Sequence, residues 1–132
     1  MIVGLGCDIV NIKRLEKTDD FLTRFQNKIL GPNEQAELAQ KNLKTEKEKA
    51  CLLAKYYAGK EAFSKALGTG FIDSIFLKDI QILHTELGKP ILQISGNAQN
   101  YLQKLSSSPV LHISLSDDYP YAQAVVIIET EN

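Results

Sequence analysis

The sequence of 132 residues is 44% hydrophobic and 23% charged, which is typical of a soluble globular domain that can bury one core without disulfide or metal cross-links. Its formal net charge of −1 does not favour nucleic-acid binding through a basic field over the whole chain. The apolar N-terminus lacks the basic leader of a signal peptide, and no apolar run is long enough to span a bilayer. The two cysteines form no metal-ligand pattern, which is consistent with buried thiols in a reducing compartment. We therefore expect a cytoplasmic protein.

The first third of the chain predicts one strand followed by two helices. Residues 2–12 are rich in β-branched and aliphatic side chains and predict a buried strand that leaves its sheet near Asp8. N-capping side chains at residues 18–20 precede an apolar pattern with helical spacing. Gly31 ends that helix, and Pro32 suits the first position of the next one.

The strongest local signal is the pair Thr45 and Glu48, which predicts a capping box at the start of a long helix. Apolar residues then recur every three or four positions, and Gly68 provides the C-terminal end. The helix is therefore amphipathic and is expected to pack on a sheet.

The remainder of the chain predicts mainly antiparallel pairing. The expected elements are strands at 75–83 and 90–94 around a Gly88-Lys89-Pro90 turn, a short helix at 95–105, and strands at 110–115 and 122–128 joined by residues 117–120. No linker or repeat divides the chain. We expect an α+β fold in which a mainly antiparallel sheet packs on a long helix, as a single domain of residues 1–132.

Two carboxylates and one lysine are candidates for chemistry. Glu61 and Lys65 lie four residues apart on one helix face, where an ordinary ion pair would also explain them. Asp8 lies within an apolar strand, where a carboxylate is costly to bury, so it is either a structural cap or a metal ligand. Together the three suit a Mg²⁺ site completed by substrate phosphates and water, with Lys65 offsetting charge on a transferring phosphorus.

Other patterns are incomplete or ambiguous. Gly4-Leu5-Gly6 lacks the third glycine and the helix of a dinucleotide motif, and no Gly-Lys-Ser/Thr phosphate loop is present. His112 precedes two serines but has no Gly-x-Ser-x-Gly elbow, so a structural role in a strand fits it better than hydrolase chemistry. The seven lysines of residues 41–65 are either a solvated face or a local site for phosphate or an acidic partner.

Four motifs, in this order, resemble those of the 4′-phosphopantetheinyl transferases, and in particular the short bacterial holo-acyl-carrier-protein synthases. They are Gly6-Cys7-Asp8-Ile9, the Lys-Glu-Ala-Phe-Ser-Lys-Ala-Leu-Gly stretch of residues 60–68, Gly88-Lys89-Pro90, and residues 112–116. The likeness runs from Met1 to about Glu129. It implies transfer of phosphopantetheine from coenzyme A to a serine of apo-acyl carrier protein, which gives the holo carrier and adenosine 3′,5′-bisphosphate in support of fatty-acid biosynthesis.

The resemblance also assigns site residues. Asp8 and Glu61 match the family's magnesium ligands and Lys65 its phosphate-contacting lysine, while either Glu61 or a metal-bound water takes the proton of the serine. The positions that match contacts to coenzyme A are Ser64, Lys65, Gly68, Gly88, Lys89, Pro90 and Ser116.

The family's short members are homotrimers with a site at each subunit junction, so the same assembly is implied here. The helical region that meets the acidic carrier protein matches Arg14, Arg24, Phe25 and Lys28. Electrostatic steering of such a partner is physically sensible. Core packing is the alternative role for Phe25.

One departure from the family pattern is Asp117, which stands where a histidine is usual. A carboxylate would repel a pyrophosphate unless it meets the metal, a lysine or water. Two alternative functions follow from the resemblance: a non-catalytic descendant that keeps the trimer and a binding surface, and a broader transferase acting on peptide-synthetase carriers, which the short length disfavours.

Overall fold

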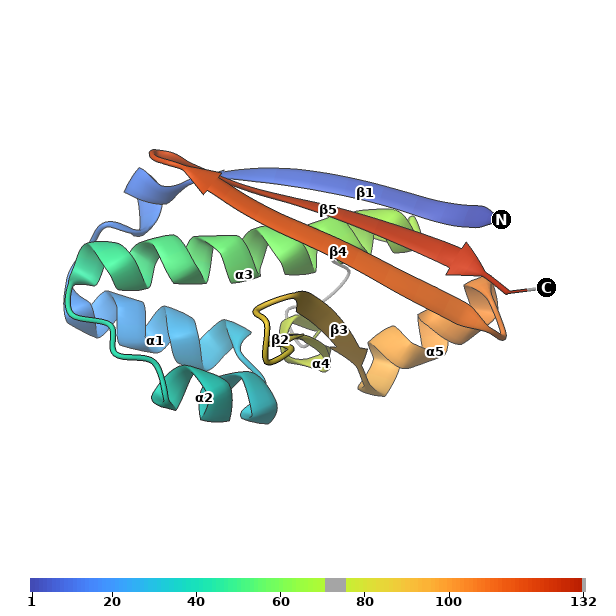
Figure 1. The fold of residues 1–132 in the computed structure, drawn as a ribbon, viewed down its shortest axis with the longest axis horizontal. Helices are drawn as coiled ribbons and strands as arrows, with labels where there is room; N and C mark the ends of the chain where they lie inside the picture. The colour runs from blue at the N-terminus through green and yellow to red at the C-terminus, as the bar shows by residue number, and fades with distance from the viewer. Residues whose placement is uncertain (71–75, 132) are drawn as a thin grey trace.

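Helix α3 (Glu46–Leu67) runs through the middle of the molecule (Figure 1). The structure is a computed structural model and describes residues 1–70 and 76–131. One side of α3 is covered by an antiparallel sheet in the order β1-β5-β4, made of β1 (Ile2–Asn11), β5 (Tyr121–Thr130) and β4 (Pro109–Asp118). The short 3₁₀ helix η1 (Ile12–Leu15) follows β1.

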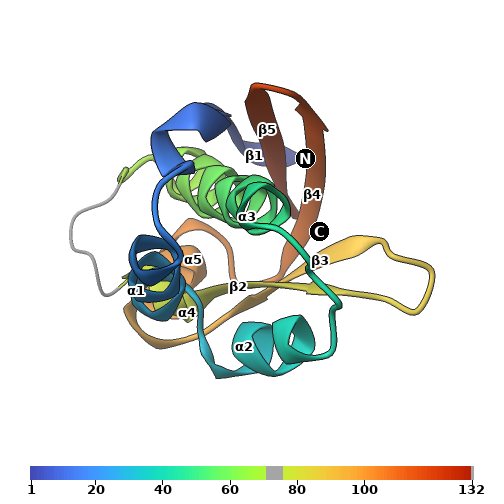
Figure 2. The ribbon, with the colours of Figure 1, turned by 90° about the vertical axis from the view of Figure 1, so that its left-hand side faces the viewer.

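The other side of α3 is covered by helices and a second, two-stranded antiparallel sheet (Figures 1 and 2). These elements are α1 (Asp19–Ile29), α2 (Pro32–Ala39), α4 (Phe76–Asp79), β2 (Ile80–His84), β3 (Pro90–Ile94) and α5 (Gly96–Leu105). The predicted α+β class with antiparallel pairing is confirmed. Within the described residues, no helix has both the length and the apolar character needed to cross a membrane.

The helix ends follow the local signals in the sequence. Thr18 Oγ1 accepts a hydrogen bond from Phe21 N at 3.1 Å, and Thr45 Oγ1 accepts one from Glu48 N at 3.0 Å. The Glu48 carboxylate accepts from the backbone N–H of Lys44, one residue earlier than the capping box predicts. Gly68 ends α3 with a φ of 84°, in the left-handed region that glycine adopts without strain.

The first strand is longer in the sheet than predicted. Asp8 pairs with Ala124 of β5, and the ladder continues to Asn11, so the strand does not leave the sheet near Asp8. The last two strands also extend further than expected, and only Tyr119 and Pro120 join them. The central strand β5 therefore pairs along nearly its whole length with β1 on one side and with β4 on the other.

Strand β1 lies directly on the backbone of α3 because it carries two glycines on its inner face. A Cβ atom on Gly6 would lie 1.9 Å from the carbonyl oxygen of Ala62, and one on Gly4 would lie 2.3 Å from that of Ala66. Either side chain would push the strand away from the helix. Asp8 follows on the same face, so its side chain is directed toward α3.

A buried ion pair joins the helices to β2. Both side chains of Lys60 and Glu34 are fully buried, and Lys60 Nζ lies 2.7 Å from Glu34 Oε1. Lys60 Nζ also donates to the carbonyl oxygens of Leu77 and Ile80, and Glu34 Oε2 accepts from Ile82 N at 2.9 Å. Burial raises the pKa of Glu34 and lowers the pKa of Lys60.

The same contacts explain a wrong prediction. Residues 75–83 were expected to form one strand, but residues 76–79 form the short helix α4, and the strand begins at Ile80. Residue 75 lies outside the described residues. The carbonyl oxygens of Leu77 in α4 and of Ile80, the first residue of β2, both accept from the buried ammonium of Lys60, which holds the junction of helix and strand against α3.

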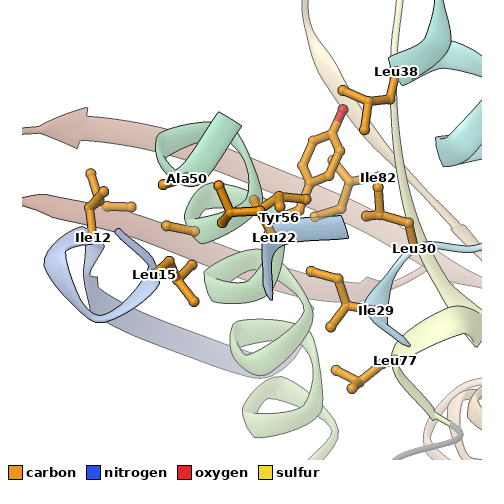
Figure 3. Packing of buried hydrophobic residues seen from close by; sticks show 13 residues of the cluster. Ile12, Leu15, Leu22, Ile29, Leu30, Leu38, Ala50, Tyr56, Leu77 and Ile82 are labelled. Carbon is orange, nitrogen blue, oxygen red and sulfur yellow. The ribbon is translucent and has the colours of Figure 1, made fainter. Parts of the chain in front are cut away.

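The main hydrophobic core fills the space between α3 and the elements below it. Figure 3 shows Tyr56 of α3 among side chains from α1, α2 and β2, including Leu22, Leu38 and Ile82. Tyr56 is fully buried, and its hydroxyl has no hydrogen-bond partner among the described residues. A second cluster lies between α3, the three-stranded sheet and α5. The two clusters bury most of the surface of α3, and only the remaining face of the helix is exposed to solvent.

Candidate functional site

Asp8, Glu61 and Lys65 line one cavity of about 450 Å³ between β1, η1, α1 and α3. The cavity is lined by Asp8, Ile9, Val10, Arg14, Leu15, Phe25, Tyr57, Glu61 and Lys65. The fold thus brings together the three side chains that sequence reasoning selected. They converge because β1 lies against the last turns of α3.

The lysine pairs with the acid of the strand. Lys65 Nζ lies 3.0 Å from Asp8 Oδ1 and donates to the carbonyl oxygen of Cys7 at 3.1 Å. In the described part of the chain no ion pair joins Lys65 to Glu61, although their spacing would allow one. The side chain of Asp8 is only 16% exposed, so Lys65 compensates its partial burial. The hydrogen bond to Asp8 raises the pKa of Lys65, which keeps the ammonium charged.

The carboxylate of Glu61 has a raised pKa in this cavity. Partial burial raises the pKa of Glu61, and the nearby charge of Asp8 raises it further. Hydrogen bonding with Tyr57 and the charge of Lys65 act in the opposite direction. Burial and the charge of Glu61 also raise the pKa of Tyr57 to about 12, so its hydroxyl remains a donor at neutral pH.

The donor set of the cavity fits magnesium. Two carboxylates from different elements face the same space, and the charge of Asp8 disfavours that of Glu61, which a divalent cation would relieve. Across residues 1–70 and 76–131 no group of three or more His, Cys, Asp or Glu side chains is arranged for a metal ion. The residues therefore do not suit a closed structural zinc site, whereas Mg²⁺ commonly takes one or two carboxylates and fills its shell with phosphate and water.

Two of the residues predicted to meet the carrier protein line this cavity, and two lie outside it. Arg14 and Phe25 belong to its wall. The Phe25 ring lies 5.6 Å from that of Tyr57 and also packs against the core, so its position agrees with both roles considered for it. Arg24 and Lys28 are exposed on α1, and Arg24 Nε lies 3.3 Å from Asp20 Oδ2.

The residues predicted to contact coenzyme A are dispersed over one chain. Ser64 is 2% exposed, and its hydroxyl donates to the carbonyl oxygen of Glu61 at 2.8 Å. Gly68 ends α3. Gly88 and Lys89 belong to the β2–β3 turn, and Pro90 begins β3. Ser116 is exposed on β4, at the edge of the sheet opposite β1. Of this set only Lys65 lines the cavity with the carboxylates.

Tyr57 belongs to the site but was not among the predicted site residues. By its spacing, Tyr57 fits the apolar pattern that predicts α3. The missed signal is its position four residues before Glu61, which is itself four residues before Lys65, so the three side chains form one stripe on the helix. His112, in contrast, lies outside the cavity and pairs with Glu129 across β4 and β5.

A model of the 4′-phosphopantetheinyl transferase superfamily matches residues 4–124. The chain belongs to this superfamily. The holo-[acyl-carrier-protein] synthase of Brucella ovis is 39% identical to it over an alignment that covers 98% of this chain and 96% of the relative. The resemblance recognised in the four motifs is confirmed.

Solved members of the superfamily have the same fold. The holo-[acyl-carrier-protein] synthase of Neisseria meningitidis has a TM-score of 0.82 at 34% identity and covers 98% of this chain and 99% of its own. The synthase of Bacillus anthracis, in complex with coenzyme A (3′,5′-ADP), has a TM-score of 0.75 at 32% identity and covers 99% of both chains. Similarity over nearly the full length of each chain agrees with the α+β architecture described above.

Asp117, the departure from the superfamily pattern, is paired with a lysine. Lys55 Nζ lies 3.1 Å from Asp117 Oδ1, and Cys51 Sγ contacts Asp117 Oδ2 at 3.5 Å. The hydrogen bond from Lys55 lowers the pKa of Asp117, so the carboxylate is charged at neutral pH. An acid at this position was expected to need the metal, a lysine or water as its partner. In the structure the partner of Asp117 is Lys55.

Proposed function

We propose that the chain transfers the 4′-phosphopantetheine group of coenzyme A to a serine of apo-acyl carrier protein. The products are holo-acyl carrier protein and adenosine 3′,5′-bisphosphate, and the reaction supports fatty-acid biosynthesis in the cytoplasm. Magnesium is the cofactor, and one domain of residues 1–132 carries the activity. The proposal rests above all on the convergence of Asp8, Glu61 and Lys65 in one cavity.

The chemistry assigns a role to each of these side chains. The serine oxygen forms a new bond to the phosphorus next to the pantetheine, and the bond from that phosphorus to the bridging diphosphate oxygen breaks. Magnesium held by Asp8 and Glu61 would neutralise the diphosphate. Lys65 stabilises the negative charge on the transferring group. Glu61, or a water bound to the metal, would take the proton of the serine hydroxyl.

The proposed active form is a homotrimer with its sites at the subunit junctions. The outer face of the three-stranded sheet exposes apolar side chains, including Leu5 at 66% and Ile9 at 62%. Such a strip is suited to burial against another subunit. A neighbouring chain would also supply the β2–β3 turn and Ser116, which lie away from the cavity within one chain.

The proposed surface for the carrier protein surrounds the entrance near α1. Arg14, Arg24 and Lys28 are exposed cationic side chains on η1 and α1, and Phe25 provides an apolar contact between them. A basic surface with one aromatic anchor suits an acidic helix.

Mass spectrometry of the carrier protein tests this function directly. Purified protein incubated with coenzyme A, Mg²⁺ and apo-acyl carrier protein should add one phosphopantetheine to the carrier. Chelation by EDTA should stop the reaction, and excess Mg²⁺ should restore it. A carrier of unchanged mass after hours of incubation would contradict the proposal and favour a non-catalytic descendant.

Substitution of Asp117 tests whether the departure from the family pattern limits the rate. Asp117→His removes a carboxylate from the neighbourhood of the phosphates and releases Lys55, so we expect an unchanged or higher transfer rate. Loss of this half-exposed ion pair should lower the free energy of unfolding by no more than about 1 kcal/mol. A collapse of the rate in steady-state assays would mean that Asp117 has a positive role of its own.

A further inference from the structure

The stripe of Tyr57, Glu61 and Lys65 places a phenol hydroxyl inside the candidate site. Residues four apart on a helix lie one above the other, so each of these side chains is a neighbour of the next. All three line the cavity that also contains Asp8 and Arg14. Tyr57 is thus the aromatic residue of α3 that faces the carboxylates, whereas Tyr56 points into the core (Figure 3).

The ring of Tyr57 is fixed by packing. It is half-buried and lies 5.6 Å from the Phe25 ring at an interplanar angle of 52°, and Phe25 in turn stacks on Phe21 at 6.1 Å. A phenylalanine would make the same contacts, so packing does not require the hydroxyl. Tyr57 lies one helical turn before Glu61, and both side chains line the same cavity. Beyond the effect of burial, interaction with Glu61 raises the pKa of Tyr57, and interaction with Tyr57 opposes the rise in the pKa of Glu61.

We propose that Tyr57 is a positioning residue for Glu61: its hydroxyl donates a hydrogen bond to one carboxylate oxygen and leaves the other oxygen directed to the cation and the phosphates. This inference rests on the proposed function, because it takes Glu61 as a magnesium ligand. It goes further by giving the reaction a residue that acts through Glu61 without touching the reacting atoms.

The physical need for such a donor follows from the charges in the cavity. Asp8 and Glu61 repel each other, and the lysine of the site hydrogen-bonds to Asp8, not to Glu61. Glu61 therefore lacks the fixed cationic partner that orients Asp8. Hydrogen bonds that orient a metal-binding carboxylate strengthen metal binding, and their loss typically costs 10- to 100-fold in affinity or activity.

The variant Tyr57→Phe removes only the hydroxyl. Titration with Mn²⁺ alone, followed by electron paramagnetic resonance, should show an affinity about 10-fold weaker than that of the wild-type protein. In transfer assays kcat should fall by about 10-fold while KM for coenzyme A changes by less than about two-fold. The midpoint of thermal unfolding should stay the same, because the ring contacts are kept.

Tyr56→Phe is the matched control, since it removes the same atom from the adjacent residue of the same helix. The Tyr56 hydroxyl is buried in the core and has no hydrogen-bond partner among the described residues, so Mn²⁺ affinity and kcat should both equal the wild-type values. Wild-type Mn²⁺ affinity and kcat in Tyr57→Phe would overturn the inference and leave the proposed function standing. Failure of the wild-type protein to transfer would overturn the proposed function instead, while the Mn²⁺ titrations of the two variants would still decide the role of Tyr57.

Discussion

Replacement of Glu61 by glutamine is expected to lower the rate of phosphopantetheine transfer by about 10²- to 10³-fold, since loss of a metal ligand forfeits several kcal/mol of transition-state stabilisation. Glutamine has nearly the same shape as glutamate, so the contacts of α3 with the sheet are retained. It carries no negative charge, and it cannot accept the proton of the serine. Both deficits act at the chemical step, so kcat should fall more than KM for coenzyme A rises.

The same substitution should not destabilise the fold at neutral pH. Partial burial and the charge of Asp8 raise the pKa of Glu61, so the folded protein disfavours the ionised carboxylate. The wild-type protein therefore loses stability as the pH rises from the unfolded-state value of 4.5 through the folded-state pKa of Glu61. The glutamine variant lacks this loss and should be at least as stable as wild type at pH 7, with an advantage that disappears in acid.

Steady-state transfer assays and urea unfolding between pH 4 and pH 7.5 measure the two effects together. Glu131→Gln makes the same chemical change on an exposed side chain at the end of β5 and should alter neither quantity. A Glu61→Gln variant with wild-type kcat would remove Glu61 from the metal site. A variant that is clearly less stable at pH 7 would instead show that the glutamate serves the fold.

The sequence was sufficient for the features that depend on neighbouring residues. Thr18, Thr45 and Gly68 mark the helix ends correctly because capping is decided within one turn. The convergence of Asp8 with Glu61 and Lys65 was also expected, because a carboxylate in an apolar strand needs a partner and because the family resemblance places the three residues in one site. The partner of Asp8 is Lys65. The spacing of residues on α3 could not show whether Lys65 pairs with Asp8 or with Glu61.

Features that depend on distant segments were missed. The role of Gly4 and Gly6 in the contact of β1 with α3 could not be predicted, because the backbone that they approach lies about sixty residues away in the chain. Asp117 was expected to need a partner, yet nothing local singles out Lys55 among the seven lysines of residues 41–65. The prediction of strand at residues 76–79 was wrong, because the ammonium group of Lys60 that binds this segment belongs to another element.

That ammonium group should be the most important charge for the stability of the fold. Lys60→Met keeps most of the volume and the apolar stem of the side chain but leaves Glu34 buried without its ion partner. Breaking a fully buried pair in this way costs about 3–5 kcal/mol, which should lower the midpoint of thermal unfolding by roughly 10 °C or more. Two carbonyl groups, those of Leu77 and Ile80, also lose their donor, which places the expected cost toward the upper end.

Two further variants separate the buried pair from the loss of a lysine in general. Lys55→Met makes the same change five residues earlier on α3, where the partner Asp117 is 39% exposed, and should cost no more than about 1 kcal/mol. Lys60→Met combined with Glu34→Gln removes both buried charges and should recover part of the lost stability, because no uncompensated carboxylate remains. A double variant less stable than Lys60→Met would mean that Glu34 stabilises the fold mainly through the backbone groups of Gly31 and Ile82, with the ion pair contributing little.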